Sequence, residues 1–288
     1  MDTGANLTNR SLDDDDDDDD DSEPAVVHLS RSEDRGVWVL ELNNGEDNRF
    51  TPRFFAQFNA ALDAVEQASP DGPAALVIKG PRPGTSKFFS NGFDVAWLTD
   101  AATQGDALRS LHALLVRLLS FCAPTVCCVT GHAFAGGAML ALACDARVMN
   151  GDRGYLCTNE LDLGLPFTDG MMALFHLKVP PAARAPLLLF GERLTAKRAV
   201  SLGLVDAALP AGELEAAALA LAQRQAPKGA KKALYRSTKE QLFGQLADNG
   251  AGAVAGAGAG GGGGGPLGVL RAQAAEGEPP PLPPFAKL

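Results

Sequence analysis

An apolar strand that runs directly into a glycine turn and a compact apolar helix constrains this chain more than any other feature. Residues 124–129 read PTVCCV, small residues follow, and an apolar helical run occupies 138–144 before Asp145. This succession leaves the backbone N–H groups at the helix start without intrahelical partners. Gly136 and Gly137 lack a Cβ, so a ligand oxygen can approach closely, and the helix dipole favours negative charge there. The stretch predicts a main-chain oxyanion site; the alternative is a Gly-Gly turn that only solves a packing problem.

A carboxylate follows this turn at a distance of about twenty residues. Glu160 has mostly apolar neighbours, and Met139 lies on the apolar helix before it. Apolar surroundings would keep the site dry and raise the pKa of a carboxyl group, which suits a residue that takes up and returns a proton. The apolar residues expected around it are Leu161, Leu163, Leu165 and Met139. The alternative reading of Glu160 is a surface or helix-start carboxylate that follows Thr158.

The net charge of −10 comes from one end of the chain. Residues 1–23 contain eleven acids, nine of them in the run Asp13–Asp21, and one base, so the remainder is about neutral. A neutral remainder offers no nucleic-acid-binding surface. The five cysteines form no CxxC pair, which favours buried reduced thiols, and the four histidines show no metal spacing. Neither a secretory leader nor a membrane span is expected, since the longest apolar run, Ala133–Cys144, has 12 residues.

Strand patterns alternate with helix patterns, which predicts an α/β fold with a largely parallel core. Strands are expected at 36–42, 75–80, 126–129 and 146–149, and helices at 52–65, 105–121, 138–144, 170–179, 212–225 and 228–246. Residues 1–24 are expected to form a disordered acidic tail, 25–190 the core and 191–249 a helical C-terminal part. Residues 250–288 are read as a Gly/Ala-rich and Pro-rich tail, without a dinucleotide site because no strand precedes its glycines.

Three segments resemble the crotonase (enoyl-CoA hydratase/isomerase) superfamily. Phe88–Asp94 resembles its first oxyanion loop, Thr130–Asp145 its second loop and helix, and Leu194–Asp206 the segment after its core. The pattern around the glycines and Glu160 is most similar to plant-type peroxisomal Δ3,Δ2-enoyl-CoA isomerases. The resemblance implies a crotonase-like ββα spiral with a C-terminal helical region. It also implies assembly as a homotrimer or hexamer.

The resemblance assigns roles to individual positions. The N–H groups of Phe93 and Gly136 would form the oxyanion hole for the thioester carbonyl of an acyl-CoA substrate, and Glu160 would be the catalytic residue. No cofactor and no metal are implied. Residues implied to contact the substrate are Ser90, Asn91, Gly92, Asp94, Gly137 and Met139. Asp94, like Asp162, is read from its context as a turn or helix-start residue rather than a catalyst.

One departure from the family pattern decides the expected reaction. Hydratases of the family carry a Glu on the helix after the glycines and a second Glu about twenty residues later, and Met139 occupies the first position here. A single carboxylate suits transfer of a proton along the acyl chain, as in isomerisation of 3-enoyl-CoA to 2-trans-enoyl-CoA in fatty-acid beta-oxidation. The alternatives are a hydratase or another crotonase activity, and a catalytically silent acyl-CoA-binding protein.

The last three residues bear on localisation. Ala286, Lys287 and Leu288 are close to the Ser-Lys-Leu peroxisomal address. The sequence therefore predicts a peroxisomal protein that a peroxisomal import receptor recognises through this tripeptide.

Overall fold

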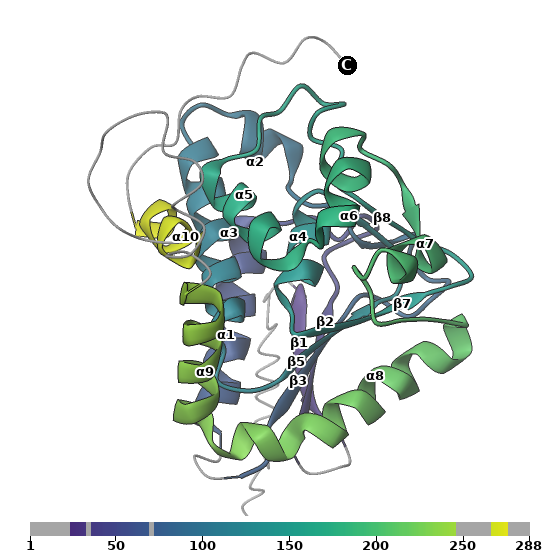
Figure 1. Ribbon diagram of the computed structural model, residues 1–288, viewed down its shortest axis with the longest axis vertical. Helices are drawn as coiled ribbons and strands as arrows, with labels where there is room; N and C mark the ends of the chain where they lie inside the picture. Colours follow the sequence, from purple (N-terminus) through teal and green to yellow (C-terminus); the bar gives the residue numbers. More distant parts are fainter. Residues whose placement is uncertain (1–23, 33–35, 69–71, 246–265, 276–288) are drawn as a thin grey trace, which may run out of the picture.

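The computed structural model describes residues 24–32, 36–68, 72–245 and 266–275 (Figure 1). A six-stranded sheet with the order β1-β2-β3-β5-β7-β10 lies beside a four-stranded sheet with the order β4-β6-β8-β9. The larger sheet comprises β1 (Val27–Arg31), β2 (Val37–Leu42), β3 (Ala75–Lys79), β5 (Thr125–Val129), β7 (Ala146–Asn150) and β10 (Ala207–Leu209). The smaller sheet comprises β4 (Phe88–Ser90), β6 (His132–Phe134), β8 (Tyr155–Cys157) and β9 (Leu194–Thr195).

Helices surround and connect the two sheets. The α-helices are α1 (Pro52–Gln67), α2 (Val95–Thr99), α3 (Gln104–Leu119), α4 (Gly136–Ala143), α5 (Asp169–Lys178), α6 (Pro181–Arg184), α7 (Ala196–Ser201), α8 (Ala211–Gln225), α9 (Lys232–Gln245) and α10 (Pro266–Ala275). A π-helical turn spans Ala185–Leu189, and a 3₁₀ turn spans Ala226–Ala230. No helix of the described residues is long and apolar enough to cross a membrane.

The chain repeats one unit that places a strand in each sheet. β3, β5 and β7 pair in parallel in the larger sheet, and each is followed within a few residues by β4, β6 or β8 of the smaller one. These three short strands also pair in parallel. Helices follow the first two strand pairs before the next repeat begins. This is the ββα spiral expected from the sequence, and the α/β class is confirmed.

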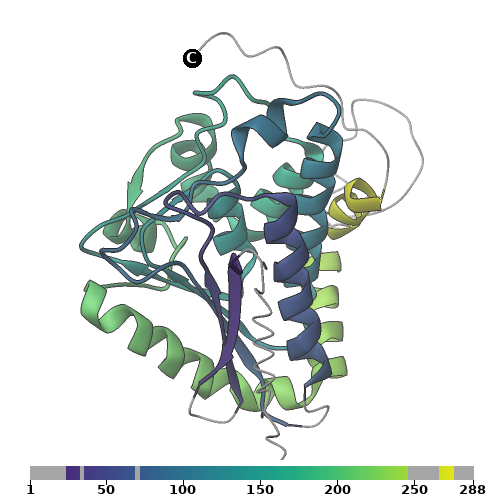
Figure 2. The ribbon, with the colours of Figure 1, turned by 180° about the vertical axis from the view of Figure 1, so that it is seen from behind.

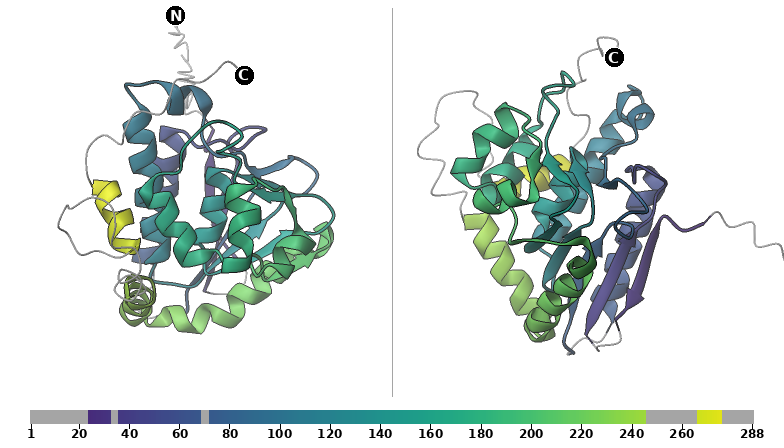
Figure 3. Two further views of the ribbon diagram at one scale, coloured as in Figure 1. Left: turned by 45° about the horizontal axis from the view of Figure 1, so that its top comes forward. Right: turned by 90° about the vertical axis from the view of Figure 1, so that its right-hand side faces the viewer.

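Both faces of the central strands β3 and β5 are buried, which explains their continuous apolar runs. On β3, Ala75 and Val77 pack with α8 on one face, while Leu76 and Ile78 belong to the core on the other. Figure 1 shows α8 lying along the sheet, and Figure 2 shows α1 from behind, beside the β1–β2 hairpin. The right-hand view of Figure 3 shows that hairpin at the edge of the sheet.

The helix predicted after Thr51 forms as α1. The Thr51 side chain accepts a hydrogen bond from the Phe54 N–H, and Pro52 occupies the first turn, as the pattern of an N-cap followed by proline indicated. The predicted apolar stripe, Phe54, Phe58, Ala61, Leu62 and Val65, is buried. This stripe fixes α1 against the core beside the loop that begins at Phe50.

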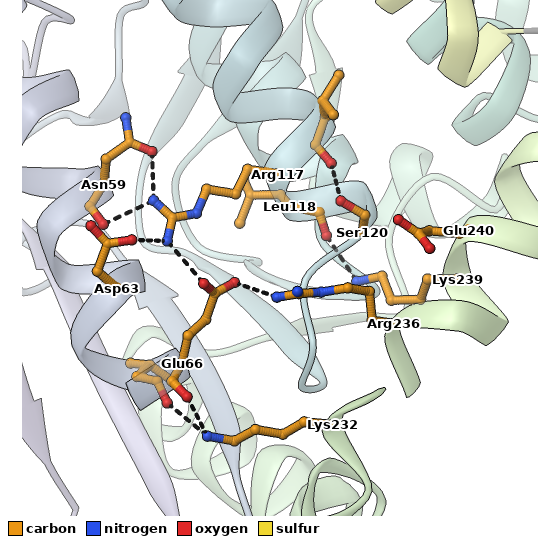
Figure 4. Close-up of polar contacts among 12 residues, drawn as sticks. Asn59, Asp63, Glu66, Arg117, Leu118, Ser120, Lys232, Arg236, Lys239 and Glu240 are labelled. Atoms are coloured by element: carbon orange, nitrogen blue, oxygen red, sulfur yellow. Dashed lines mark hydrogen bonds and ion pairs between the residues drawn. The ribbon is translucent and has the colours of Figure 1, made fainter. Parts of the chain in front are cut away.

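Ion pairs and hydrogen bonds of charged side chains connect α9 to α1 and α3 (Figure 4). Glu66 of α1 pairs with Arg117 of α3 at 3.3 Å and with Arg236 of α9 at 2.8 Å. The Lys232 ammonium donates to the carbonyl oxygens of Glu66 and Ala68 at 2.7 Å, at the C-terminal end of α1. A cation at a helix C-terminus also interacts favourably with the helix dipole. The predicted C-terminal helical part is thus docked on the core.

One helix occupies a stretch that the sequence analysis expected to be only a tail. The helix α10 packs against α3 and α5, and the Leu270 side chain is fully buried. The Gln273 Oε1 accepts a hydrogen bond from the Gly170 N–H at 2.6 Å. The adjoining Gly/Ala-rich and Pro-rich segments gave no sign of this short helix. The acidic residues 1–23, the Gly/Ala stretch 250–265 and the tripeptide Ala286–Leu288 lie outside the described residues.

Candidate active site

A cavity of about 260 Å³ lies at the N-terminal end of α4. Helices α2, α3 and α5 contribute much of its apolar wall, while the loops around residues 91–93 and 159–166 contribute half of its polar side chains, among them Glu160. Its lining comprises Arg49, Asn91, Phe93, Val95, Leu98, Thr99, Leu108, Ala135, Gly136, Met139, Asn159, Glu160, Leu163, Leu165, Pro166, Thr168 and Met171. The cavity therefore gathers segments that are far apart in the sequence.

Glu160 supplies the carboxylate of this lining. Its side chain is 5% exposed, and its Oε2 has no hydrogen-bond partner among the described residues. Burial raises the pKa of the Glu160 carboxyl to about 7. A hydrogen bond from the residue's own backbone has a smaller, opposite effect on this pKa. The N–H groups of Leu163 and Leu165 both donate to the Glu160 carbonyl, so a tight turn holds the residue in place. A carboxyl group with this pKa can both accept and release a proton near neutral pH.

The Phe93 N–H points away from Phe50, because Phe50 binds the carbonyl of the same peptide unit. The carbonyl of Gly92 accepts from the Phe50 N–H at 2.8 Å, and the Asp94 N–H donates to the Phe50 carbonyl at 2.9 Å. In a trans peptide the C=O and N–H point in opposite directions. The Phe93 N–H makes none of the hydrogen bonds found among the described residues. Phe93 itself lines the cavity.

The Gly136 N–H is left free for a different reason, which is its position at the start of a helix. Gly136 is the first residue of α4, and the carbonyl of the preceding Ala135 accepts from the Met139 N–H at 3.1 Å inside the helix. The Gly136 N–H consequently points out of the helix start. Ala135 has φ 49° and ψ −121°, an unusual conformation for a residue with a Cβ. Its N–H donates to the Cys157 carbonyl at 2.9 Å, which helps to hold this backbone in place.

The two loops that carry these amides are in direct contact. A Cβ on Gly92, whose φ is +74°, would lie 3.0 Å from the Gly136 nitrogen. A Cβ on Gly137 would lie 2.4 Å from the Ser90 carbonyl oxygen. The glycines therefore allow the two main chains to approach closely, and this brings Phe93 and Gly136 to the same cavity. Phe93, Gly136 and the Glu160 carboxylate thus line one cavity.

Four residues that the sequence analysis expected to contact a substrate do not line the cavity. Ser90 is fully buried: its hydroxyl donates to the Asn48 carbonyl and accepts from the Gly92 N–H. Gly92 and Gly137 form the contact between the loops, and the Asp94 side chain caps α2 by accepting from the Trp97 N–H. These residues shape the backbone on which the site depends. Asn91 and Met139 do line the cavity, as do Phe93, Gly136 and Glu160.

Substituting Gly137 with alanine tests the contact between the loops. The new Cβ would collide with a backbone carbonyl, which cannot rotate away, so the free energy of unfolding should fall by about 2–3 kcal/mol. Turnover should fall as well, because the Ser90 loop carries the Phe93 amide. Gly212→Ala is the matched control, since nothing lies within 4 Å of its added Cβ. Urea unfolding and a turnover assay measure both effects; wild-type values for Gly137→Ala would contradict this account.

The sequence analysis missed part of the polar lining and misplaced one apolar residue. Arg49, Asn159 and Thr168 line the cavity; of these only Asn159, adjacent to Glu160, could have been suspected from its position. The Arg49 guanidinium donates to the Phe93 carbonyl at 3.0 Å. Leu161 is 50% exposed and lies outside the cavity, because the turn folds back onto residue 160 and leaves Leu161 on its outer side.

The histidines contribute no side chain to the lining. His112 is buried behind the wall, with Nε2 2.9 Å from the Thr168 hydroxyl, and burial lowers its pKa to about 4. His132, which was considered for a role in shaping the pocket, stacks on Tyr155 elsewhere on the smaller sheet. Among the residues that the structure describes, no group of three His, Cys, Asp or Glu side chains could hold a metal ion.

Comparisons with known proteins relate this chain and its fold to one family. Residues 32–259 match the family described as enoyl-CoA hydratase/isomerase. Enoyl-CoA delta isomerase 2, peroxisomal, of Arabidopsis thaliana is 33% identical over 225 residues, which cover 74% of this chain and 92% of that protein. An enoyl-CoA hydratase of Mycobacterium marinum superposes with a TM-score of 0.69 at 25% identity, covering 86% of this chain and 96% of the other. Human mitochondrial delta3-delta2-enoyl-CoA isomerase superposes with a TM-score of 0.67 at 23% identity, covering 75% and 83%.

Proposed function

Since this chain belongs to the enoyl-CoA hydratase/isomerase family, we propose that it converts 3-enoyl-CoA to 2-trans-enoyl-CoA with Glu160 as its acid–base residue. The observation that carries the proposal is a buried carboxylate whose Oε2 has no partner among the described residues, in the same cavity lining as Phe93 and Gly136, whose N–H groups are free. The similarity to a plant enoyl-CoA delta isomerase supports the same reaction.

Proton transfer within the substrate needs one base and a stabilised enolate. The Glu160 carboxylate removes a proton from C2 of the acyl chain, and the C–H electron pair delocalises toward the thioester oxygen. The Phe93 and Gly136 N–H groups donate to this oxygen as its charge develops; losing one such donor typically costs about 3–4 kcal/mol of barrier stabilisation. The protonated Glu160 then returns the proton at C4, and the double bond moves from C3–C4 to C2–C3. No proton or electron leaves the complex.

The identity of residue 139 favours isomerisation over hydration. Hydration of a double bond requires the activation of a water and the protonation of carbon, which family hydratases divide between two carboxylates. Met139 is fully buried and lines the cavity, so its thioether adds apolar surface where a hydratase would have the first acid. Within the described lining Glu160 is the only carboxylate. Hydratase activity is the second candidate, because a hydratase shares the fold at 25% identity.

A direct assay separates the candidates. Purified protein incubated with 3-hexenoyl-CoA should produce conjugated 2-hexenoyl-CoA, seen as a rise in ultraviolet absorbance. With 2-hexenoyl-CoA as the starting compound, hydratase activity would instead remove that absorbance. If 2-hexenoyl-CoA is consumed about as fast as it is formed from 3-hexenoyl-CoA, a hydratase would be favoured. Binding of acyl-CoA without either change would leave a catalytically silent binding protein and refute the proposed reaction.

We also propose that the protein works in peroxisomes. The C-terminal Ala286-Lys287-Leu288 and the peroxisomal designation of the Arabidopsis relative support this location. A fluorescent fusion with these three residues at its C-terminus should enter peroxisomes, and removing only the tripeptide should leave the fusion in the cytosol. Unchanged peroxisomal import after the removal would show that the tripeptide is not the address.

A further inference from the structure

A second cavity, of about 410 Å³, opens between α5 and α9, away from the candidate active site. Its lining comprises Asp145, Leu177, Lys178, Tyr235, Thr238, Lys239, Leu242 and Phe243. None of these residues lines the first cavity. The two cavities lie at opposite ends of α4, whose 8 residues span about 12 Å at a rise of 1.5 Å per residue. We call this second cavity the α5–α9 cleft.

Positive charge exceeds negative charge beside this cleft. Arg147, Lys178 and Lys239 are cations around the single carboxylate of Asp145, a group that carries a net charge of +2 when all four are ionised. The Arg147 guanidinium is already engaged by the main chain, because it donates hydrogen bonds to the backbone carbonyls of Leu204 and Cys144 at 2.7 Å. The two lysines face the cleft.

The Asp145 carboxylate is already occupied by other partners. Its Oδ1 pairs with the Lys239 ammonium at 2.8 Å, and its Oδ2 accepts from the Thr125 N–H at 2.9 Å and the Tyr235 hydroxyl at 3.1 Å. Lys239 also donates to the Leu118 carbonyl at 2.8 Å, a contact drawn in Figure 4. Lys178 therefore has no carboxylate in contact with it among the described residues.

Lys178 retains unused donors in a half-buried position. Of its three N–H groups, the hydrogen bonds of the described residues use one, to the Cys144 carbonyl at 2.9 Å. The ammonium also lies 5.0 Å from the centre of the Phe243 ring. A partly desolvated cation without a carboxylate in contact is unfavourable, and an anion bound to it would relieve that cost. Leu177, Leu242 and Phe243 add apolar surface at the same cleft.

We propose that the α5–α9 cleft is an anion-binding site in which Lys178 and Lys239 hold a carboxylate or phosphate group. The free lysine donors would bind the anion, and the apolar lining would accept a hydrocarbon chain attached to it. The site is separate from the proposed isomerase reaction and does not depend on it.

Isothermal titration calorimetry with octanoate, acetate and inorganic phosphate as the probes tests the site. Lys178→Met should weaken anion binding about 10-fold or more, the range expected when a charged hydrogen bond is lost. Arg147 still serves the Cys144 carbonyl in this variant, so folding should be retained. Octanoate that binds more tightly than acetate would identify an amphiphile as the ligand, and equal binding would identify a small free anion; both outcomes support the site.

A second variant avoids the buried network altogether. Leu242 lines the cleft and is 57% exposed, so Leu242→Glu should weaken anion binding several-fold by repulsion. Leu234→Glu is the matched control, because Leu234 is 62% exposed on the same helix and lies outside the cleft. Isomerase turnover should be unchanged in both variants. Equal effects of the two substitutions on binding would overturn the proposal.

The pH dependence provides an independent readout. Burial, together with Arg147 and Lys239, lowers the pKa of the Lys178 ammonium to about 8, against an opposing effect of Asp145. Anion affinity should therefore decrease as pH rises from 7 through about 8 to 9, whereas exposed lysines would keep it until above about pH 10. Absence of binding at pH 7, or affinity constant from pH 7 to 9, refutes the site. A changed oligomeric state of Leu242→Glu with unaltered anion binding would instead identify a contact between copies and also refute it.

Discussion

Replacing Glu160 with glutamine is expected to lower kcat/KM for 3-enoyl-CoA isomerisation by about 10²–10⁴-fold, the usual contribution of a positioned acid–base group. The substitution preserves the shape of the side chain and removes its capacity to accept a proton. The main-chain donors at Phe93 and Gly136 remain, so acyl-CoA binding should persist. A stopped assay with 3-hexenoyl-CoA and a direct binding measurement separate these two effects.

The wild-type pH profile provides the second half of this prediction. The base must be ionised in the free enzyme, so kcat/KM should rise with pH through about 7, the pKa to which burial raises the Glu160 carboxyl. Asp162→Asn is the matched control, since Asp162 is exposed in the same turn and does not line the cavity. Retention of activity in Glu160→Gln, or an equal loss in Asp162→Asn, would rule out the proposed role of Glu160.

The parts of the site that the sequence predicted are those with a local cause. A strand, a glycine turn and an apolar helix within about twenty residues determine that the Gly136 N–H is left unpaired, whatever the rest of the fold does. The N-cap at Thr51 and the apolar stripe of α1 are likewise determined by residues that are neighbours in the sequence. The likeness of the Phe88–Asp94 segment to a known loop supplied the second amide. Glu160 followed from its place relative to these elements.

The parts that the sequence did not predict depend on tertiary packing. Whether Ser90 or Asn91 faces the cavity is decided by the contact between two loops, and the glycine pattern alone does not say which side chains turn inward. Arg49 and Thr168 reach the cavity from separate elements with no motif around them. The helix α10 is stabilised by Leu270 and Gln273 against α3 and α5, a docking that its own composition does not reveal.

Glu160→Gln should also make the folded protein more stable at alkaline pH. The carboxyl pKa rises from an ordinary value of 4.5 to about 7 on folding, and one pKa unit is worth about 1.4 kcal/mol, so the ionised form destabilises the fold by about 3 kcal/mol. The folded pKa lies above the unfolded one. The penalty is therefore absent below pH 4.5, grows as pH rises and is complete above about pH 7.

Urea unfolding of both proteins at pH 5 and pH 8 measures this penalty. The stability advantage of Glu160→Gln over the wild type should widen by about 2–3 kcal/mol between the two pH values. Any pH-independent effect of the amide cancels in this comparison. If the ionised carboxylate instead made contacts that stabilise the fold, Glu160→Gln would be less stable than the wild type. That loss of stability would be largest at the pH values where the carboxylate is ionised. A gain in stability combined with a loss of turnover would thus distinguish a residue retained for chemistry from one retained for structure.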